Sequence, residues 1–446
     1  MGQTKAMRTK YLIIGNSAGG IGAAEAIREA GKTGPITIIS DEKYPTYSRP
    51  LIAKYLTGER DLDGMLFRPA EFYGQNDIAF LPGERVKVLE LESRTAELDS
   101  GGRIVCEKLL LATGGVPIVP RMEGVGKRGV FTFISLDDAK AIDVFLDNAS
   151  KAVVIGGGLI GISVTEALVK RGVEVTVVEM KERILNTILD EQASLIVEQA
   201  LRQAKVSIVT SHTVAEISGE DTVKGVVLDD REVILCDLVV VAIGVMPRIE
   251  LVEGIGIKVN RGIVVDRHMA TSHPDVYSCG DAAEAYDFVY GENRLTPIWP
   301  NAYFGGRIAG YNMAGIETEY PGGTAMNSLN YFGLDIASAG MVAATDGDGF
   351  EVLSRQENGI YQKVVLKDGL LAGMVFVGDI ENSGIIFNLM RDRVNVSDFK
   401  QALLADDFGL ASLPRELWQE RLEAPPLELA SQPVLPVDVM EDVAGE

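Results

Sequence analysis

The sequence predicts an α/β fold: two domains built on parallel sheets, followed by a C-terminal α+β domain. Three observations support this. A strand, a glycine-rich turn and a helix occur twice, from Lys10 and from Lys151. Each copy is followed by another apolar, β-branched run, PITIIS and VEVTVVE, which is the βαβ order of a parallel sheet. From about Met326 the pattern changes to short strands, with a Lys-Asp-Gly hairpin turn at 367–369.

The composition is that of a folded chain with several domains. Its 446 residues suffice for about three domains. Hydrophobic residues make up 46% and charged residues 24%, close to globular averages. The net charge of −22 would repel a phosphate backbone, so we expect no nucleic-acid partner. The longest apolar stretch, residues 153–169, contains glycines and Glu166, which favours a buried strand, turn and helix over a membrane span.

Cysteines and histidines are few and scattered. Cys106, Cys236 and Cys279 form neither a CxxC pair nor a disulfide framework, which predicts a reducing, cytoplasmic location. The first apolar run, YLIIG, is too short for a signal peptide. The three histidines include no HxxxH spacing, and we expect no metal site.

The C-terminal region carries two short helical patterns and an acidic tail. One helix is expected to start near Ser397, a plausible N-cap. The last 24 residues, 423–446, contain six acidic residues, four prolines and no Lys or Arg. Such a tail is expected to be extended or disordered unless a partner orders it.

The second glycine turn predicts a Rossmann-like dinucleotide site. Gly156, Gly158 and Gly161 form GxGxxG between a strand and a helix. These glycines permit the tight turn, the approach of a pyrophosphate and close helix packing, and the helix N-terminus favours the phosphates. Glu179 ends the next strand, where a carboxylate accepts hydrogen bonds from an adenosine ribose. It would repel a 2′-phosphate and so favours NADH, although Lys181 and Arg183 could admit NADPH.

The first glycine turn is less regular. Gly15, Ser17 and Gly20 form GxSxxG, in which serine is small enough for close approach of a phosphate. Asp41 and Glu42 follow the second strand, and either could hold a ribose.

Several motifs in order resemble the FAD-dependent pyridine nucleotide oxidoreductases, flavoproteins with two dinucleotide-binding domains related to glutathione reductase. They are GNSAGGIG, YSRPLIAKYL, LLLATGG, GGGLIG, VVVAIG and VYSCGDAAEA, and together they cover about residues 11–310. The sequence looks most like the branch of NADH:rubredoxin oxidoreductases, NADH oxidases and ferredoxin reductases. The segment VVLKDGLLAGMVFVGD resembles the C-terminal domain of rubredoxin and nitrite reductase relatives.

The resemblance implies FAD and NADH as cofactors. It divides the chain into an FAD domain (1–117 and 245–320), an NAD domain (118–244), a C-terminal interface domain (321–422) and the tail (423–446). The expected FAD-binding residues are Gly15, Ser17, Ala18, Gly20, Asp41, Glu42, Arg49, Lys54, Val86, Thr113, Gly114, Gly280 and Asp281. The expected NAD-binding residues are Gly156, Gly158, Leu159, Ile160, Gly161, Glu179 and Gly244.

Arg49 and Lys54 match the family's segment beside the isoalloxazine ring, and Lys54 is the candidate catalytic residue. A positive charge there would stabilise the reduced flavin. The alternative is a solvated helix lysine. Asp281 matches the carboxylate that binds the ribityl chain.

The sequence departs from the family at two points. The segment YPTYSRPLIAK lacks the redox cysteine of disulfide-reducing members, and all three cysteines are interpreted as structural. A dithiol or cysteine-sulfenate cycle is therefore excluded. Many relatives also have a glutamate two places after the last glycine of the NAD turn, where this chain has Ser163. The proton transfers that relatives carry out near flavin N5 are therefore not assumed here.

These features predict hydride transfer from NADH to flavin N5, with most of the catalysis supplied by positioning. Electrons then leave for an external iron–sulfur, rubredoxin- or ferredoxin-type carrier, in a reaction that could be reversible. The segment DDFGLASLPRELW resembles flavoproteins linked to carbon monoxide dehydrogenase. Arg391, Arg393 and Lys400 are candidates for the docking patch. A homodimer is also expected.

Two alternatives stay open at this level. The reduced flavin could pass its electrons to O₂, a quinone or another small acceptor. The chain could instead be a non-catalytic scaffold or redox-sensor subunit that binds FAD and NADH, although its complete cofactor motifs favour an enzyme.

Overall fold

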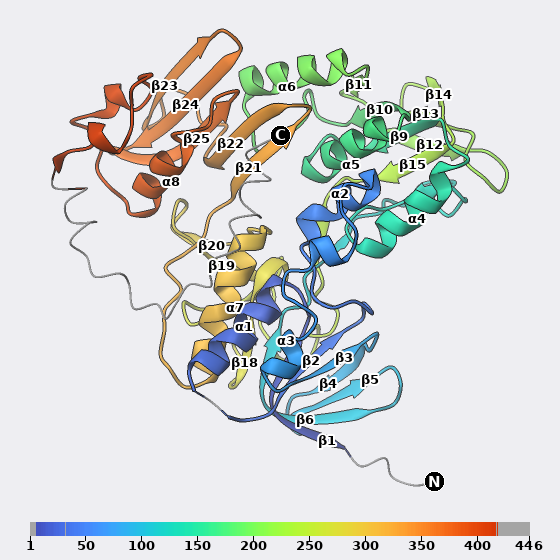
Figure 1. The fold of residues 1–446 in the computed structure, drawn as a ribbon, viewed down its shortest axis with the longest axis vertical. Helices are drawn as coiled ribbons and strands as arrows, with labels where there is room; N and C mark the ends of the chain where they lie inside the picture. The colour runs from blue at the N-terminus through green and yellow to red at the C-terminus, as the bar shows by residue number, and fades with distance from the viewer. Residues whose placement is uncertain (1–5, 32, 416, 418–446) are drawn as a thin grey trace. The chain divides into compact units, whose positions relative to one another are not determined.

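The computed structural model describes residues 6–31, 33–415 and 417 (Figure 1). The predicted acidic tail, 423–446, lies outside these residues. The chain forms two compact units. Unit 1 takes the described residues up to 119, residues 132–144 and residues 244–325. Unit 2 takes residues 120–131, residues 145–243 and the described residues from 326 onward. The predicted domain boundaries stay predictions, but residues from 326 group with the second glycine turn and not with the first.

Unit 1 is built on a seven-stranded sheet in the order β3-β2-β1-β6-β5-β4, with β18 paired to β6. The strands β1, β2, β3, β6 and β18 run parallel, and β4 and β5 form an antiparallel extension. Their side chains form apolar clusters on both faces, as expected for buried parallel strands. The strands are β1 Met7–Ile14, β2 Ile36–Ser40, β3 Ile78–Pro82, β4 Val86–Glu90, β5 Thr95–Leu98, β6 Arg103–Leu111 and β18 Val276–Ser278.

Two helices of unit 1 pack side by side, α1 and α7 (Figure 1). Glycines allow this approach, since a Cβ on Gly306 would lie 2.0 Å from the carbonyl oxygen of Gly19. A smaller antiparallel pair, β7 with β16, joins the segments at the ends of the LLLATGG and VVVAIG motifs. The remaining main elements are α1 Ala18–Glu29, α2 Ile52–Thr57, α3 Phe72–Gln75, β7 Gly115–Pro117, α4 Leu136–Leu146, β16 Val245–Pro247, β17 Ile263–Val264, β19 Ala283–Asp287, β20 Glu292–Arg294 and α7 Trp299–Met313.

Unit 2 contains a parallel sheet in the order β11-β10-β9-β15-β8 and a small antiparallel sheet, β12-β13-β14. The predicted strand–turn–helix unit is confirmed as β9, the glycine turn and α5. In the part of the chain that the structure describes, no helix has both the length and the apolar character needed to cross a bilayer. The elements are β8 Val130–Phe131, β9 Lys151–Ile155, α5 Leu159–Lys170, β10 Glu174–Glu179, α6 Glu191–Gln203, β11 Ser207–Thr210, β12 Val214–Ser218, β13 Gly225–Leu228, β14 Val233–Leu235 and β15 Leu238–Val241.

The C-terminal part of unit 2 is an antiparallel sheet in the order β21-β22-β25-β24-β23, with α8 packed on it. The predicted hairpin is confirmed: Asp368 and Gly369 both have positive φ between β24 and β25. The prediction of a helix starting near Ser397 was wrong. Val396 donates its N–H to the carbonyl of Gly369, which holds this segment against the hairpin, and a short 3₁₀ turn follows in place of a helix. The elements are β21 Met326–Tyr331, β22 Leu334–Gly340, β23 Phe350–Glu357, β24 Ile360–Lys367, β25 Leu370–Val377, α8 Ser383–Arg391 and the 3₁₀ turn Lys400–Ala402.

Candidate functional site: two glycine turns

The first glycine turn connects β1 to α1 in a conformation that requires glycine. Gly15 has φ +122°, and a Cβ there would lie 2.0 Å from the carbonyl oxygen of Ala112. A Cβ on Gly20 would lie 2.0 Å from the carbonyl oxygen of Gly15. Ser17 is the N-cap of α1 and Ala18 its first residue, but the Ser17 side chain makes no capping hydrogen bond. The N–H groups of the first helical turn therefore lack a side-chain cap and can bind a phosphate.

A cavity of about 270 Å³ opens beside this turn and brings together residues far apart in the sequence. The predicted residues Gly15, Asp41, Val86 and Thr113 all line it. This cradle fits the adenosine end of an FAD molecule. Sequence reasoning missed its other polar lining residues, which are Ser40, Glu84, Arg85, Lys87, Asp99, Arg248 and Glu250.

Arg248 is the most informative of the missed residues. Its guanidinium lies 2.6 Å from the Asp41 carboxylate, and its backbone N–H donates to the carbonyl of Gly114. Thr113 donates its hydroxyl to the carbonyl of Arg248 at 2.8 Å. The available signal in the sequence was a basic residue shortly after the VVVAIG motif, which ends at Gly244.

The two candidate ribose acids have separate environments. Asp41 lines the cavity, whereas Glu42 forms an ion pair with Arg49 and accepts a hydrogen bond from the Tyr47 hydroxyl at 2.7 Å. Arg49 also donates to the carbonyl of Ile134 at 2.9 Å. Glu42 thus orients Arg49, Asp41 pairs with Arg248, and the assignment of a ribose to either acid stays a prediction.

The remaining predicted FAD residues lie on connected parts of unit 1. Gly280 has φ +72° and begins the 3₁₀ turn after β18. Burial raises the pKa of Asp281, and the positive charge of Arg49 opposes that rise. Arg49 and Asp281, far apart in the sequence, thus share one electrostatic environment. Lys54 is half-buried on α2, which ends at Gly58 with φ +78°.

The second glycine turn, between β9 and α5, repeats the first. Gly156 has φ +109°, and its Cβ would lie 2.4 Å from the carbonyl oxygen of Ala242. A Cβ on Gly161 would lie 1.8 Å from the carbonyl oxygen of Gly156. Gly158 is the N-cap of α5, followed by Leu159 and Ile160 in its first turn. A Cβ on Gly158 would meet no described protein atom within 4 Å, which leaves the space for a ligand.

Glu179 ends β10 beside this turn, as predicted. Its side chain is buried, and its carboxylate accepts N–H bonds from Gly157 at 2.7 Å and from Lys181 at 2.8 Å. The carboxylate thus lies at the edge of the turn. A ribose hydroxyl that donates to it would compete with these two N–H groups. Gly244 belongs to unit 1, where its carbonyl accepts the N–H of Ile118, so its predicted NAD contact stays a prediction.

Comparison with known proteins identifies the family of the chain. The family model described as "Pyridine nucleotide-disulphide oxidoreductase" matches residues 9–306. The chain belongs to this family. FAD and NADH are its cofactors, and it is an oxidoreductase, as the sequence predicted. A second model, "Rubredoxin NAD+ reductase C-terminal domain", matches residues 326–394.

Individual relatives have related redox functions. The chain is 32% identical to the epsilon subunit of an NADH-dependent phenylglyoxylate dehydrogenase from Aromatoleum evansii, over 90% of this chain and 96% of the relative. It is 32% identical to an NADH oxidase from Methanocaldococcus jannaschii, over 70% and 71%. The solved structure of a ferredoxin reductase from Rhodopseudomonas palustris is 27% identical, with a TM-score of 0.78, and covers 84% of this chain and 92% of that one.

The cysteines of this pyridine nucleotide oxidoreductase are all buried. Burial raises the pKa of Cys106 to about 11 and the pKa values of Cys236 and Cys279 to about 12. Cys279 packs against Gly19 at the start of α1, so it is close to the first turn, but its thiol stays protonated at neutral pH. The three thiols are free in the structure. Their environment supports the structural role that the sequence predicted.

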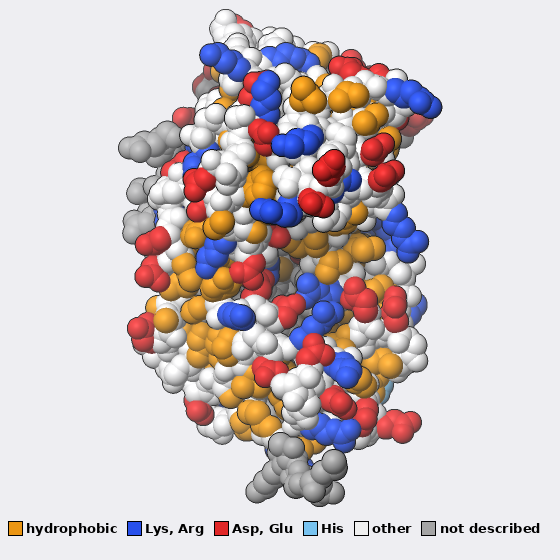
Figure 2. Space-filling view, turned by 90° about the vertical axis from the view of Figure 1, so that its right-hand side faces the viewer, with side chains coloured by type: hydrophobic (Ala, Val, Ile, Leu, Met, Phe, Trp, Pro, Cys, Tyr) orange, Lys and Arg blue, Asp and Glu red, His pale blue; other side chains and the backbone are white. Residues whose placement is uncertain are grey.

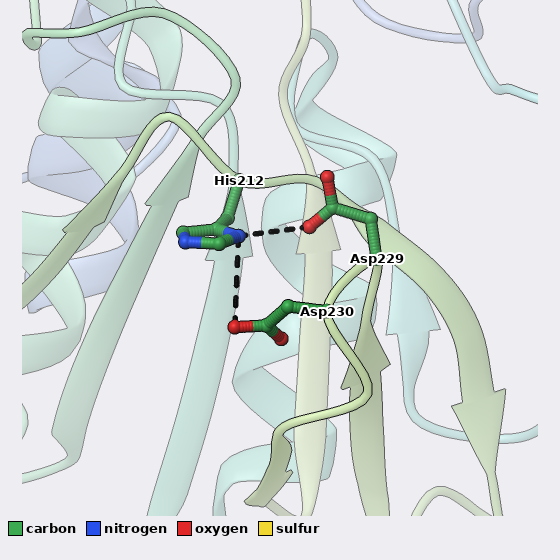
Figure 3. Close-up of side chains that lie close together, drawn as sticks. All are labelled: His212, Asp229 and Asp230. Atoms are coloured by element: carbon green, nitrogen blue, oxygen red, sulfur yellow. Dashed lines mark hydrogen bonds and ion pairs between the residues drawn. The ribbon is translucent and has the colours of Figure 1, made fainter.

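Among the described residues, one group could offer three metal ligands: His212, Asp229 and Asp230 (Figure 3). His212 Nδ1 lies 2.9 Å from Asp229 and 3.9 Å from Asp230. The hydrogen bond to Asp229 raises the pKa of His212 and lowers that of Asp229. This ion pair accounts for the closeness of the three groups, and we assign no metal to them.

Gly158→Ala separates folding from nucleotide binding. Because the added methyl group meets no described protein atom, we expect an unchanged melting temperature and FAD content. NADH binding should weaken about tenfold or more, since the methyl group would enter the space of the pyrophosphate. Calorimetric titration with NAD⁺ measures this effect. Unchanged affinity would place the nucleotide elsewhere.

Glu179→Ala tests coenzyme choice. Removing a carboxylate that bonds a ribose hydroxyl should cost about 1.5–3 kcal/mol of NADH binding, roughly 10–100-fold. NADPH should lose much less, so the ratio of kcat/KM for NADH over NADPH should fall by at least tenfold. Glu182→Ala, an exposed acid in the following loop, serves as the control. A ratio equal to that of the wild type would reject the assigned role of Glu179.

Proposed function

We propose that this protein oxidises NADH and delivers the electrons to an external iron–sulfur carrier of the rubredoxin or ferredoxin type. The observation that supports it is the pair of glycine turns, each followed by a helix without a side-chain N-cap, combined with three buried, protonated thiols. The turns provide places for two dinucleotides. The thiols provide no internal acceptor for the two electrons.

The residues have distinct tasks in this proposal. Bound FAD supplies the chemistry that connects a two-electron donor to one-electron acceptors. Gly15, Ser17 and Gly20 hold its pyrophosphate, and Asp41 holds its ribose. Glu42 orients Arg49, whose charge lies close enough to Asp281 to influence its pKa. Lys54 supplies a second positive charge next to the ring.

The nucleotide site acts mainly by positioning. Gly156, Gly158 and Gly161 place the pyrophosphate on the N-terminus of α5, and Glu179 fixes the ribose. Leu159 and Ile160 provide apolar surface in the first helical turn. Holding donor and acceptor in one geometry removes much of the entropic part of the barrier, so no general acid or base is required.

The carrier is proposed from the C-terminal domain and the relatives. Residues 326–394 match a domain named for rubredoxin reductases, and one relative is a subunit of an NADH-dependent dehydrogenase. The link to carbon monoxide dehydrogenase stays a prediction, because its segment includes residues outside those described. A carrier of low potential would allow the reverse reaction, NAD⁺ reduction.

The predicted basic docking patch is largely neutralised. Lys400 lies 2.6 Å from Glu351, and Arg391 lies 2.9 Å from Asp392. Side chains of both charges are interspersed on the face shown in Figure 2. Local complementarity of charge between the two surfaces, and not the net charge of −22, would therefore decide where a carrier docks.

The second candidate is oxidation of reduced flavin by O₂. It is favoured by the resemblance to an NADH oxidase, which is 32% identical over 70% of this chain. Two further expectations stay proposals: a homodimer, and a reducing cytoplasmic location, which the free cysteines support.

Steady-state assays distinguish these acceptors. With NADH in excess, we expect turnover with a rubredoxin or a ferredoxin to exceed turnover with air-saturated buffer by at least tenfold. NADH should also bleach the flavin under anaerobic conditions without any carrier. If O₂ supported turnover as fast as every carrier tested, the oxidase function would replace the one proposed. An intact flavin that did not bleach would contradict NADH oxidation itself.

Thiol alkylation tests the absence of a cysteine cycle. With pKa values near 11–12, roughly one thiol in a thousand or fewer is ionised at pH 8. Iodoacetamide at pH 8 should therefore leave NADH turnover unchanged, and labelling should become fast only in denaturant. Mass spectrometry counts the labelled residues. Rapid inactivation with a single labelled cysteine would show that a thiol takes part.

A further inference from the structure

The C-terminal sheet contacts the nucleotide turn directly. Tyr331, the last residue of β21, donates its hydroxyl to the carbonyl of Leu159 at 3.1 Å. Leu159 is the first residue of α5 and directly follows Gly158. The Tyr331 side chain is buried, so water does not compete freely for this carbonyl. Both residues belong to unit 2.

The hairpin turn after Tyr331 makes a second contact with the same helix. Phe332 and Gly333 have φ +53° and +76°, which is the pattern of a type I′ turn. Phenylalanine is uncommon at positive φ, because its Cβ crowds the backbone there. The Phe332 N–H donates to the Glu166 carboxylate on α5 at 2.9 Å. This charged hydrogen bond offsets the strain of the turn and fixes its tip on the helix.

Another anchor holds the start of α6. Asp190 is the N-cap of α6 and accepts the N–H of Ala193 at 3.1 Å. The same carboxylate accepts the Tyr361 hydroxyl at 2.7 Å and forms an ion pair with Lys363 at 3.0 Å. Lys363 is buried on β24 and also donates to the carbonyl of Val342. A buried charge with these partners resists displacement, because separating the pair would leave a charge uncompensated.

The anchored segment before α6 lies against the glycine turn. Residues 180–189 connect Glu179 to Asp190, and Leu185 in this loop donates its N–H to the carbonyl of Gly157 at 2.8 Å. Ile184 packs so closely that a Cβ on Gly157 would lie 2.8 Å from its methyl group. The C-terminal sheet therefore contacts α5 within the turn motif and holds the loop that packs on Gly157.

We propose that the C-terminal sheet is a positioning part of the NADH site, with Tyr331 fixing the turn through Leu159 and Asp190 fixing the adjoining loop. This inference rests on the proposed NADH site and assigns Tyr331 as a positioning residue. Neither Tyr331 nor Tyr361 needs to touch the nucleotide. Their contacts hold the uncapped N–H groups in the orientation that binds phosphate. This reduces the conformational entropy that the turn loses when the nucleotide binds.

Tyr331→Phe tests the inference, since it removes only the hydroxyl group. A single hydrogen bond contributes about 0.5–1.5 kcal/mol, so the Kd for NAD⁺, measured by calorimetry on the FAD-loaded protein, should rise about 2–10-fold. KM for NADH should rise with it, while kcat stays within about twofold. Tyr361→Phe should shift Kd in the same direction, and it provides the test if Tyr331→Phe does not fold.

The matched control is Tyr311→Phe, which removes a phenolic hydrogen bond of 2.7 Å to Glu29 in unit 1. It should leave Kd for NAD⁺ unchanged. If the wild type binds NAD⁺ and both Tyr331→Phe and Tyr361→Phe bind it equally well, the inference is overturned and the proposed function stands. The same rise in Tyr311→Phe would also overturn it. If the wild type binds no NAD⁺, the NADH site itself is wrong.

Discussion

The structure depends on one constraint: α1 and α5 each pack directly against the glycine turn that precedes them, with no side chain in between. At both turns, a Cβ on the last glycine would lie 2.0 Å or less from the carbonyl oxygen of the first glycine. At both turns, the first N–H groups of α1 and α5 have no side-chain cap. The helices then carry partial positive charge where a pyrophosphate can reach it. The same geometry occurs in both compact units.

Local patterns in the sequence predicted these turns because glycine spacing and β-branched runs act over a few residues. Glu179 was also predicted, since its position follows from the length of one βαβ unit. Arg248 was missed, because its contact with Asp41 joins segments that the chain order does not bring together. The separate environments of Asp41 and Glu42 could not be predicted either: adjacent side chains point apart, and only the folded chain shows that Glu42 meets Arg49. The prediction of a helix near Ser397 was wrong, because a long-range hydrogen bond from Val396 to Gly369 outweighs the local capping signal.

Burial decides what the cysteines can do. Cys279 packs against the first helical turn, a place where a thiolate would otherwise be stabilised by the helix dipole. Complete burial and the nearby charge of Asp281 instead raise its pKa to about 12. The chain thus keeps the family's nucleotide turns while its thiols stay protonated. That combination directs electrons out of the protein.

The C-terminal sheet makes contacts with α5 and with the start of α6. Its strands place a strained phenylalanine turn on α5 and a buried lysine on the N-cap of α6, two arrangements that cost free energy unless their partners are present. Both partners belong to segments next to the glycine turn. A sheet that only covered apolar surface would not need either feature. A carrier or a second subunit that binds this sheet would therefore contact an element already attached to the NADH turn, so that docking and nucleotide binding can influence each other through Leu159 and Asp190.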